Sequence, residues 1–412
     1  MSTTDRELRV GMVGYAFMGA AHSQAWRTVN RVFDLPARAR MSLICGRDAG
    51  KVADAADRLG WDAHTTDWRD LIARDDIDVV DVCTPGDSHA EIALAALAAG
   101  KHVLCEKPLA NTVSEARAMA AAAVTAQAAG VRSMCGFNYR RVPAVAMMRQ
   151  LVADGRLGVI RHVRATYLQD WIVDPQFPLV WRLQRDKAGS GALGDIGAHI
   201  IDLTQYVTGR RITGVSAVTE TFVKERPLPA GSSGLAATVD GAAADGNGAD
   251  GHRPATGAVT VDDAAVFVAR LDGGVLATYE ASRFATGRKN ALRVEINGSL
   301  GTVAFDLERL NELEFYDATR PAAEQGFSRI LVTEGEHPYM SAWWPPGHLI
   351  GYEHSFTHQA RDFVEAVATG VDPAPSFVDG LQVQLVLDAV TRSAELGSSW
   401  TEVEPALATV AA

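Results

Sequence analysis

The first third of the chain alternates short, continuous apolar runs with alanine-rich stretches of helical character. A continuous apolar run is typical of a strand buried on both faces, and helices between such strands make the sheet parallel. The sequence therefore predicts a doubly wound α/β domain over residues 1–140. The expected strands are 8–13, 41–45, 79–83, 102–105 and 133–136, and the expected helices are 49–59, 89–99 and 114–129, with a first helix ending at Asn30.

The pattern changes after about Arg141. Ala264–Leu271 and Val275–Ser282 alternate apolar and polar residues, and Asp272-Gly273-Gly274 between them is typical of a hairpin turn. We expect a second domain over residues 141–412, of α+β class with a mostly antiparallel sheet.

Two helical patterns end the chain, Tyr352–Ala368 and Gly380–Leu396, and glycines at positions 370 and 397 stop them. The segment 229–257 is rich in glycine, alanine, aspartate and serine and has no apolar periodicity. We expect it to be a surface loop or insertion and assign it no chemistry.

Composition excludes several classes of protein. With 412 residues, 47% of them hydrophobic and 22% charged, the chain is long enough for two cores. Its net charge of −11 comes from scattered acidic residues and disfavours nucleic acid as a partner. The charged start of the chain and the lack of a long apolar run predict a cytoplasmic protein without membrane contact.

The cysteines predict neither disulfides nor a metal site. Cys45, Cys83, Cys105 and Cys135 form no C-x-x-C pair, and each lies in or beside an apolar run. Buried thiols in a reducing compartment are the expected state.

A glycine-rich turn at Gly11–Gly19 follows the first strand and opens the first helix. In that context backbone N–H groups and a helix N-terminus can hold a pyrophosphate. Ala16 occupies the second glycine position of G-x-G-x-x-G, so we expect a displaced pyrophosphate or an altered turn. Together with the strand-helix repeat, the turn predicts a dinucleotide site.

The end of the second strand bears on the choice between NAD and NADP. Arg47 is placed to meet a 2′-phosphate, whereas Asp48 either caps the following helix or reaches the ribose of NAD. We interpret Arg47 as a preference for NADP and keep NAD as the alternative.

Lys107, in Cys105-Glu106-Lys107-Pro108, lies just past the carboxyl end of a strand, the edge where open α/β sheets bind ligands. A lysine there could hold the oxygen of an alcohol and lower its pKa during hydride transfer. The alternative is a solvated surface lysine.

Asp195 and His199 stand four residues apart, with Asp202 a further turn along. On one helical face, the carboxylate of Asp195 could orient an imidazole that exchanges the hydroxyl proton. The alternative is a buried histidine bonded to a capping aspartate.

These motifs, in this order, resemble the glucose-fructose oxidoreductase and inositol dehydrogenase family, Gfo/Idh/MocA. The resemblance spans nearly the whole chain. It is carried by residues 11–19, with Ala16 as the departure, by Thr84-Pro85-Gly86-Asp87-Ser88-His89, Glu106-Lys107-Pro108, Phe137-Asn138-Tyr139-Arg140 and Asp195-Ile196-Gly197-Ala198-His199. The stretch 166–171, with Trp181-Arg182 and 189–195, is similar to the branch that contains levoglucosan dehydrogenase.

The resemblance implies a catalytic set of Lys107, Asp195 and His199, with His199 as the proton acceptor. It implies oxidation of a ring hydroxyl of a sugar, anhydrosugar, glycoside or inositol, and a homodimer or homotetramer formed through an open-faced sheet of the second domain. The expected cofactor contacts are Gly14, Ala16, Phe17, Met18, Gly46, Arg47, Asp48, Thr84, Pro85, Ser88, His89, Glu106, Lys107 and Asn138. The expected substrate contacts are Tyr139, Arg140, Tyr167, Gln169, Asp170, Trp171, Arg182, Asp195 and His199.

Two other functions remain open at this point. A nucleotide-sensing regulator of the same fold need not keep the catalytic groups, so the presence of all three counts against it. A glycosidase that uses NAD transiently to oxidise and eliminate would share the early steps, and net glycoside cleavage without cofactor consumption would reveal it.

Overall fold

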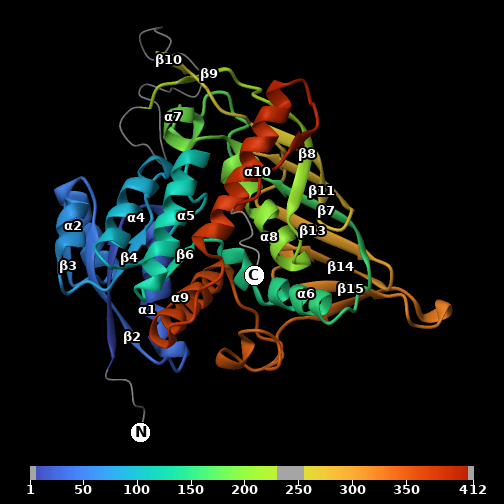
Figure 1. Cartoon of the computed structure of the whole chain (residues 1–412), viewed down its shortest axis with the longest axis horizontal. Helices are drawn as coiled ribbons and strands as arrows, with labels where there is room; N and C mark the ends of the chain where they lie inside the picture. The colour runs from blue at the N-terminus through green and yellow to red at the C-terminus, as the bar shows by residue number, and fades with distance from the viewer. Residues whose placement is uncertain (1–5, 230–254, 407–412) are drawn as a thin grey trace.

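The computed structural model describes residues 6–229 and 255–406. A parallel sheet with its helices lies on one side of the molecule and a larger sheet on the other (Figure 1). Helices α6, α8 and α10 lie between them and contact the larger sheet (Figure 1).

The parallel sheet has the strand order β3-β2-β1-β4-β5-β6. This is the doubly wound order in which the topology reverses between the first and fourth strands, so the predicted fold class is confirmed. The strands are Glu7–Val13 (β1), Arg38–Cys45 (β2), Ala63–Thr65 (β3), Val79–Val82 (β4), His102–Cys105 (β5) and Ser133–Cys135 (β6). The helices are Phe17–Val32 (α1), Ala49–Leu59 (α2), Trp68–Ala73 (α3), His89–Ala98 (α4) and Val113–Ala128 (α5).

The sequence analysis missed β3 and α3. Strand β3 has three residues and lies at the edge of the sheet, with none of them buried. A strand this short and exposed needs no apolar run, so hydrophobic periodicity gives no sign of it.

The second sheet has nine strands in the order β16-β15-β14-β13-β7-β12-β11-β8-β17. All neighbours pair antiparallel except β7 and β12. Its strands are Ile160–Leu168 (β7), Ile212–Glu220 (β8), Ala264–Leu271 (β11), Val275–Ser282 (β12), Ala291–Gly298 (β13), Gly301–Asp306 (β14), Glu312–Asp317 (β15), Phe327–Leu331 (β16) and Thr401–Glu402 (β17). The helices of this part are Pro143–Ala153 (α6), Arg185–Ala188 (α7), Ala198–Thr208 (α8), Tyr352–Thr369 (α9) and Phe377–Glu395 (α10).

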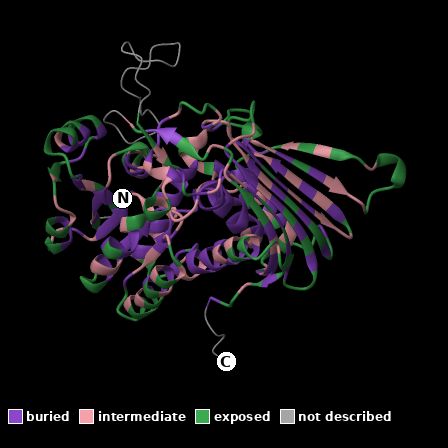
Figure 2. Ribbon diagram, turned by 90° about the horizontal axis from the view of Figure 1, so that it is seen from above, coloured by how far each residue is buried: buried purple, intermediate pink, exposed green. Residues whose placement is uncertain are grey.

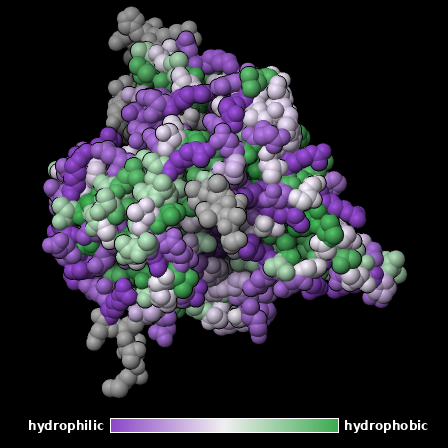
Figure 3. Space-filling model, viewed as in Figure 1, coloured by the Kyte–Doolittle hydropathy of each residue, from purple (hydrophilic) through white to green (hydrophobic). Residues whose placement is uncertain are grey.

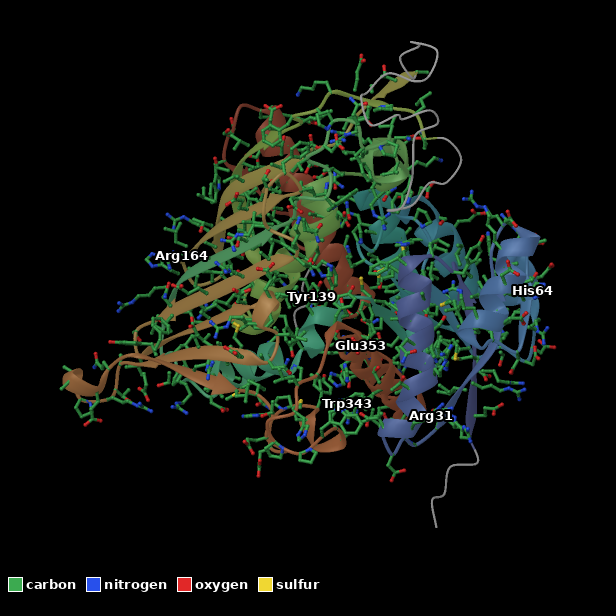
Figure 4. The ribbon with its side chains drawn as sticks, turned by 180° about the vertical axis from the view of Figure 1, so that it is seen from behind. Arg31, His64, Tyr139, Arg164, Trp343 and Glu353 are labelled. Atoms are coloured by element: carbon green, nitrogen blue, oxygen red, sulfur yellow. The ribbon has the colours of Figure 1, made fainter. Side chains whose placement is uncertain are left out.

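The hairpin of β11 and β12 has the predicted bounds and turn. Buried and exposed residues alternate along both strands, because one face of the sheet packs on helices and the other is open (Figure 2). Arg164 of β7 projects from the open face (Figure 4). Exposed apolar side chains on this face include Val218, Val266, Val268 and Leu276.

The predicted loop 229–257 falls mostly outside the described residues. At its described end, Thr256–Ala258 forms strand β10, which pairs antiparallel with Glu225–Pro227 (β9). These two strands were not predicted, since neither contains an alternating apolar pattern.

Helix α9, near the end of the chain, packs against α1 in the first part of the chain. Phe356 and Phe363 share an apolar core with Trp26 and with Val10 and Met12 of β1. Two capping glycines end the chain's long helices as expected: Gly370 adopts a left-handed conformation after α9, and Gly397 does so after α10.

The four cysteines are buried and unpaired, as predicted. Among the described residues, no helix is both long and apolar enough to cross a bilayer. On the face of the molecule in Figure 3, hydrophobic and hydrophilic residues are interspersed.

Candidate active site

A cleft of about 1460 Å³ opens at the carboxyl ends of the parallel strands, and residues of the second part form its opposite wall. Open α/β sheets bind ligands at this edge, where the strand order reverses. The cleft is larger than an ordinary small-molecule pocket, so it has room for more than one ligand.

The glycine turn forms one end of the cleft. Gly14 has a φ of +106°, and a Cβ there would lie 2.6 Å from the carbonyl oxygen of Cys83, so only glycine fits. Helix α1 then begins without a side-chain cap and without an acidic residue in its first turn. Its first N–H groups are therefore available to an anion, and the turn fits the pyrophosphate of a dinucleotide.

Ala16 does not strain this turn. Its φ of −73° and ψ of −155° are accessible to any L-residue, so the backbone requires no glycine there. The alanine is compatible with the turn as it stands.

The end of β2 contributes Arg47, Asp48 and Lys51 to the cleft. Asp48 caps α2, since its carboxylate accepts a 3.0 Å hydrogen bond from the backbone N–H of Lys51. That hydrogen bond lowers the pKa of Asp48. The capping role proposed from the sequence is confirmed, and Arg47 and Lys51 are the cations beside it.

Loops after β4 and β5 form the floor. Both ring nitrogens of His89 lie near carbonyl oxygens, 2.9 Å from that of Thr84 and 3.0 Å from that of Pro108. His89 is 1% exposed, so its contacts tie the two loops together. Asn138, after β6, lines the cleft and donates a hydrogen bond to Ser355 of α9.

Lys107 crosses the cleft to the second part of the chain. Its ammonium group donates a 2.6 Å hydrogen bond to the backbone carbonyl of Asp195 and lies 3.5 Å from Oδ1 of the same residue. A solvated surface lysine is therefore excluded, because this side chain is only 14% exposed.

The carboxylate of Asp195 is surrounded by cations. Arg283, fully buried, lies 3.6 Å from Oδ2 on the side opposite Lys107. Burial raises the pKa of Asp195, but Lys107, Arg182 and Arg283 outweigh this and lower it to about 2. Asp195 is thus ionised throughout the physiological range.

The segment that carries Asp195 is held by Asp262. Its carboxylate accepts hydrogen bonds of 2.7 Å from the N–H groups of Gly191 and Leu193. A Cβ on Gly191 would collide with the carbonyl oxygen of Asp262, so the close approach requires glycine. A turn of π-helix, Leu193–Gly197, then leads into α8 and brings Asp195 to the cleft.

His199 lies among aromatic rings, with the centroid of Tyr139 at 4.6 Å, and it lines the cleft. Burial and the nearby Lys107 hold the pKa of His199 well below its ordinary value, so the ring is neutral. Its Nδ1 is buried and has no hydrogen-bond partner among the described residues. The two residues share the cleft, but no hydrogen bond links the Asp195 carboxylate to His199 within the described part of the chain.

A chain of hydrogen bonds forms the wall beside His199. The hydroxyls of Tyr139 and Tyr167 are 2.9 Å apart, and Tyr167 donates to Asn290. Asn290 also accepts from Gln169, whose Oε1 accepts from Trp171. Tyr139 lies near the middle of the molecule, between its two parts (Figure 4). The wall offers alternating hydroxyl, amide and aromatic groups, which suit a polyol.

Most of the predicted contacts line the cleft, and two do not. Arg140 is 8% exposed and forms a buried pair with Asp202. Asp170 instead accepts hydrogen bonds from Lys289 and the N–H of Gly287. The predicted residues that line the cleft are Gly14, Ala16, Phe17, Met18, Gly46, Arg47, Asp48, Thr84, Pro85, Ser88, His89, Glu106, Lys107, Asn138, Tyr139, Tyr167, Gln169, Trp171, Arg182, Asp195 and His199.

The sequence analysis missed several cleft residues, chiefly Trp181, Arg283, Asn290 and Tyr352. Arg283 could have been noticed as a charged residue directly after the alternating strand β12. No sequence signal marks Asn290, which lies in a loop and reaches the cleft through the pairing of β7 with β13.

Two family models match the chain. The model described as an oxidoreductase family with an NAD-binding Rossmann fold covers residues 8–134. The GFO/IDH/MocA C-terminal domain covers residues 145–304. Together they span both walls of the cleft.

The chain is also similar to proteins of known activity and structure. It is 42% identical to the levoglucosan dehydrogenase of Pseudarthrobacter phenanthrenivorans over 97% of this chain and 98% of that one. A solved levoglucosan dehydrogenase in complex with NADH and levoglucosan has a TM-score of 0.87 at 40% identity, with coverage of 97% and 100%. An oxidoreductase domain protein from Kribbella flavida has a TM-score of 0.89 at 61% identity, with the same coverage.

Proposed function

Because the chain belongs to the Gfo/Idh/MocA family of oxidoreductases, we propose that it is a sugar dehydrogenase that oxidises a ring hydroxyl with a nicotinamide dinucleotide. The observation that carries the proposal is the meeting of Lys107, Asp195 and His199 in one cleft with the glycine turn. Levoglucosan, the substrate of the similar dehydrogenase, is the first candidate, with inositols and glycosides next.

The three groups have complementary roles. Lys107 donates a hydrogen bond to the reacting oxygen and stabilises the negative charge that develops as its proton leaves. His199 is neutral, so it can accept that proton. When bound, the nicotinamide supplies the hydride acceptor. Asp195 keeps Lys107 directed into the cleft through the contacts with its carbonyl and carboxylate.

The wall beside His199 selects the substrate in this proposal. Tyr167, Gln169 and Trp171 offer hydroxyl, amide and indole groups to the remaining sugar oxygens. Arg182 also lines the cleft, and its guanidinium lies over the ring of Trp181, 4.3 Å from the centroid, which leaves its N–H groups without an acceptor among the described residues. It is therefore available to a substrate oxygen. Arg140 and Asp170 are left out of the proposed contact set.

For the cofactor, we propose NAD as the working choice, since NADH is bound in the similar levoglucosan dehydrogenase. The preference for NADP inferred from Arg47 has no support from these comparisons. Arg47 and Lys51 nevertheless form a basic edge beside Asp48, so the relative affinity for the two cofactors is a direct test.

We also propose that two copies associate through the open face of the nine-stranded sheet. Val218, Val266 and Val268 form a row of exposed valines across adjacent strands. Apolar rows of this kind mark interaction surfaces. Val268→Arg should convert the oligomer to monomer in analytical ultracentrifugation; an unchanged mass would exclude this face.

The test of the proposed function is to mix the purified protein with NAD or NADP and levoglucosan, inositols and glycosides. Formation of reduced cofactor, followed by absorbance, supports the proposal. Net glycoside cleavage without lasting cofactor reduction would instead identify the glycosidase reaction. No turnover over the whole panel, with dinucleotide binding intact, would contradict the dehydrogenase assignment.

A further inference from the structure

A buried chain of ionisable side chains lies next to Lys107, and the proposed mechanism does not use it. Nδ1 of His22, in α1, lies 2.9 and 3.0 Å from the two carboxylate oxygens of Asp81 in β4. Its Nε2 lies 2.9 Å from Oε1 of Glu106, at the end of β5. The three residues are 2%, 0% and 4% exposed. Two buried carboxylates therefore share one imidazole.

The geometry makes this imidazole a cation. Two ionised carboxylates only accept hydrogen bonds, so between them both ring nitrogens of His22 donate and the ring is an imidazolium. Burial alone would lower the pKa of His22, but Asp81 outweighs it and the pKa is raised well above its ordinary value. Asp81 is itself fixed, because the indole N–H of Trp26 donates to it at 2.7 Å.

Glu106 connects this chain to the cleft. Its Oε2 accepts a 3.1 Å hydrogen bond from the backbone N–H of Lys107, and its side chain lines the cleft. On the other side, a Cβ on Gly136 would lie 2.9 Å from Oε1 of Glu106, so the carboxylate has little space to move. The backbone of Lys107 is therefore held by a carboxylate that His22 holds in turn.

The same cluster contains residue types that bind metals. Ligand atoms of His22, Asp81 and Cys83 lie within 4.8 Å of one another. A metal-bound imidazole must give up a ring proton, however, and both nitrogens of His22 are at hydrogen-bond distance from carboxylates. The geometry favours a hydrogen-bonded chain.

We propose that His22, held by Asp81, is a positioning residue for hydride transfer: it fixes Glu106 as a carboxylate at the cleft wall, and Glu106 fixes the backbone of Lys107. The activity readout of this proposal rests on the proposed function. The charge state of His22 can be measured without it.

Loss of the imidazole removes the donor that holds Oε1 of Glu106. The Glu106 side chain can then turn away from the backbone N–H of Lys107, which loses its acceptor. The titratable groups around Glu106 and His22 are Lys107, Asp81 (β4), Cys83 just after β4, Cys105 (β5), Cys135 (β6), Tyr139 and Tyr352 (α9).

The test compares His22→Gln with a matched control, His358→Gln. His358 is 0% exposed and bonded through both ring nitrogens, to the Arg141 carbonyl and to Trp343, but it does not line the cleft. At pH 7 we expect kcat of His22→Gln to fall about 10-fold or more, with dinucleotide Kd within about threefold of wild type. Equal losses of kcat in the two variants would overturn the proposal.

A double variant distinguishes an electrostatic role of His22 from a loss of activity caused by misfolding. His22→Gln combined with Asp81→Asn removes the cation and its partner carboxylate together, so no uncompensated charge stays beside Glu106. This double variant should recover part of the activity that the single variant loses. Strictly additive losses would contradict the electrostatic role.

The charge state of the His22 ring can be measured without any substrate. The ¹⁵N chemical shifts of the His22 ring in the wild-type protein should show an imidazolium up to at least pH 8. A neutral ring at pH 8, or stoichiometric metal in the purified protein, would overturn the proposal even if sugar turnover is observed. If His22 is an imidazolium but the protein turns over no sugar, the proposed function is wrong and the charge state inferred for His22 stands.

Discussion

The ammonium group of Lys107, from the nucleotide-binding part of the chain, donates a hydrogen bond to the backbone carbonyl oxygen of Asp195, from the other part. Four residues after Asp195, the imidazole of His199 lines the same cleft. This contact places the hydrogen-bond donor Lys107 and the proton acceptor His199 in one cleft. Each comes from a different part of the chain, so neither part could form the site alone.

Replacement of Lys107 by methionine should lower kcat about 100-fold or more, because the reacting oxygen loses its charged donor. Dinucleotide affinity should stay close to wild type, since Lys107 is assigned to the substrate. Isothermal titration with the cofactor and steady-state kinetics separate the two quantities. Lys224→Met, which removes an exposed lysine paired with Glu220, is the control and should change neither kcat nor dinucleotide affinity. An equal loss of turnover and cofactor affinity would show that Lys107 binds the cofactor and not the substrate.

The pH dependence of kcat/KM should show its acid limb below pH 6.5. Burial and Lys107 lower the pKa of His199, so the free enzyme keeps a neutral base as the pH falls through the ordinary histidine range. Activity is lost only as the pH falls further, through the lowered pKa of the folded state. His199→Gln should abolish this limb together with most of the activity. A wild-type midpoint at or above 6.5 would contradict the assignment.

Arg47→Ala should weaken binding of NADP much more than binding of NAD. The guanidinium can pair with a 2′-phosphate, whereas NAD offers only a hydroxyl there. Fluorescence titration with each reduced cofactor gives the two Kd values. Arg58→Ala, in helix α2, which begins just after Arg47, lies outside the cleft and is the matched control. If neither affinity changes, Arg47 has no part in cofactor selection.

Asp202→Asn should lower the free energy of unfolding by about 3 kcal/mol or more, because the buried guanidinium of Arg140 then keeps only the exposed Asp379, 4.0 Å away, as a charged partner. Asp388→Asn breaks an exposed helical pair with Arg392 and should cost about 0.5 kcal/mol or less. Urea titrations of the two variants measure the difference. Similar small effects in both would show that the Arg140 pair adds little to stability.

The elements best predicted from the sequence are those whose burial pattern is local. Helix α2, strand β5 and the β11–β12 hairpin have the expected bounds, because each alternates or repeats its apolar residues over its whole length. Strand β9 and its partner β10 were missed, since short polar strands are defined only by pairing with distant segments.

Site residues could be predicted from the sequence where their motifs lie at the ends of predicted strands. Lys107 and the glycine turn lie at such ends, and the sheet topology brings them to one edge. Arg140 lies outside the cleft although its neighbours in sequence line it, because its own side chain turns to Asp202 in α8. A partner 62 residues away leaves no local pattern.

The packing of α9 on α1 has a consequence for synthesis of the chain. Phe356, Phe363 and Val367 complete the core that contains Val10 and Trp26. The nucleotide-binding part therefore stays unfinished on the ribosome until α9, more than 200 residues after it, has emerged. Its apolar flank must remain exposed, or be covered by a chaperone, throughout that time.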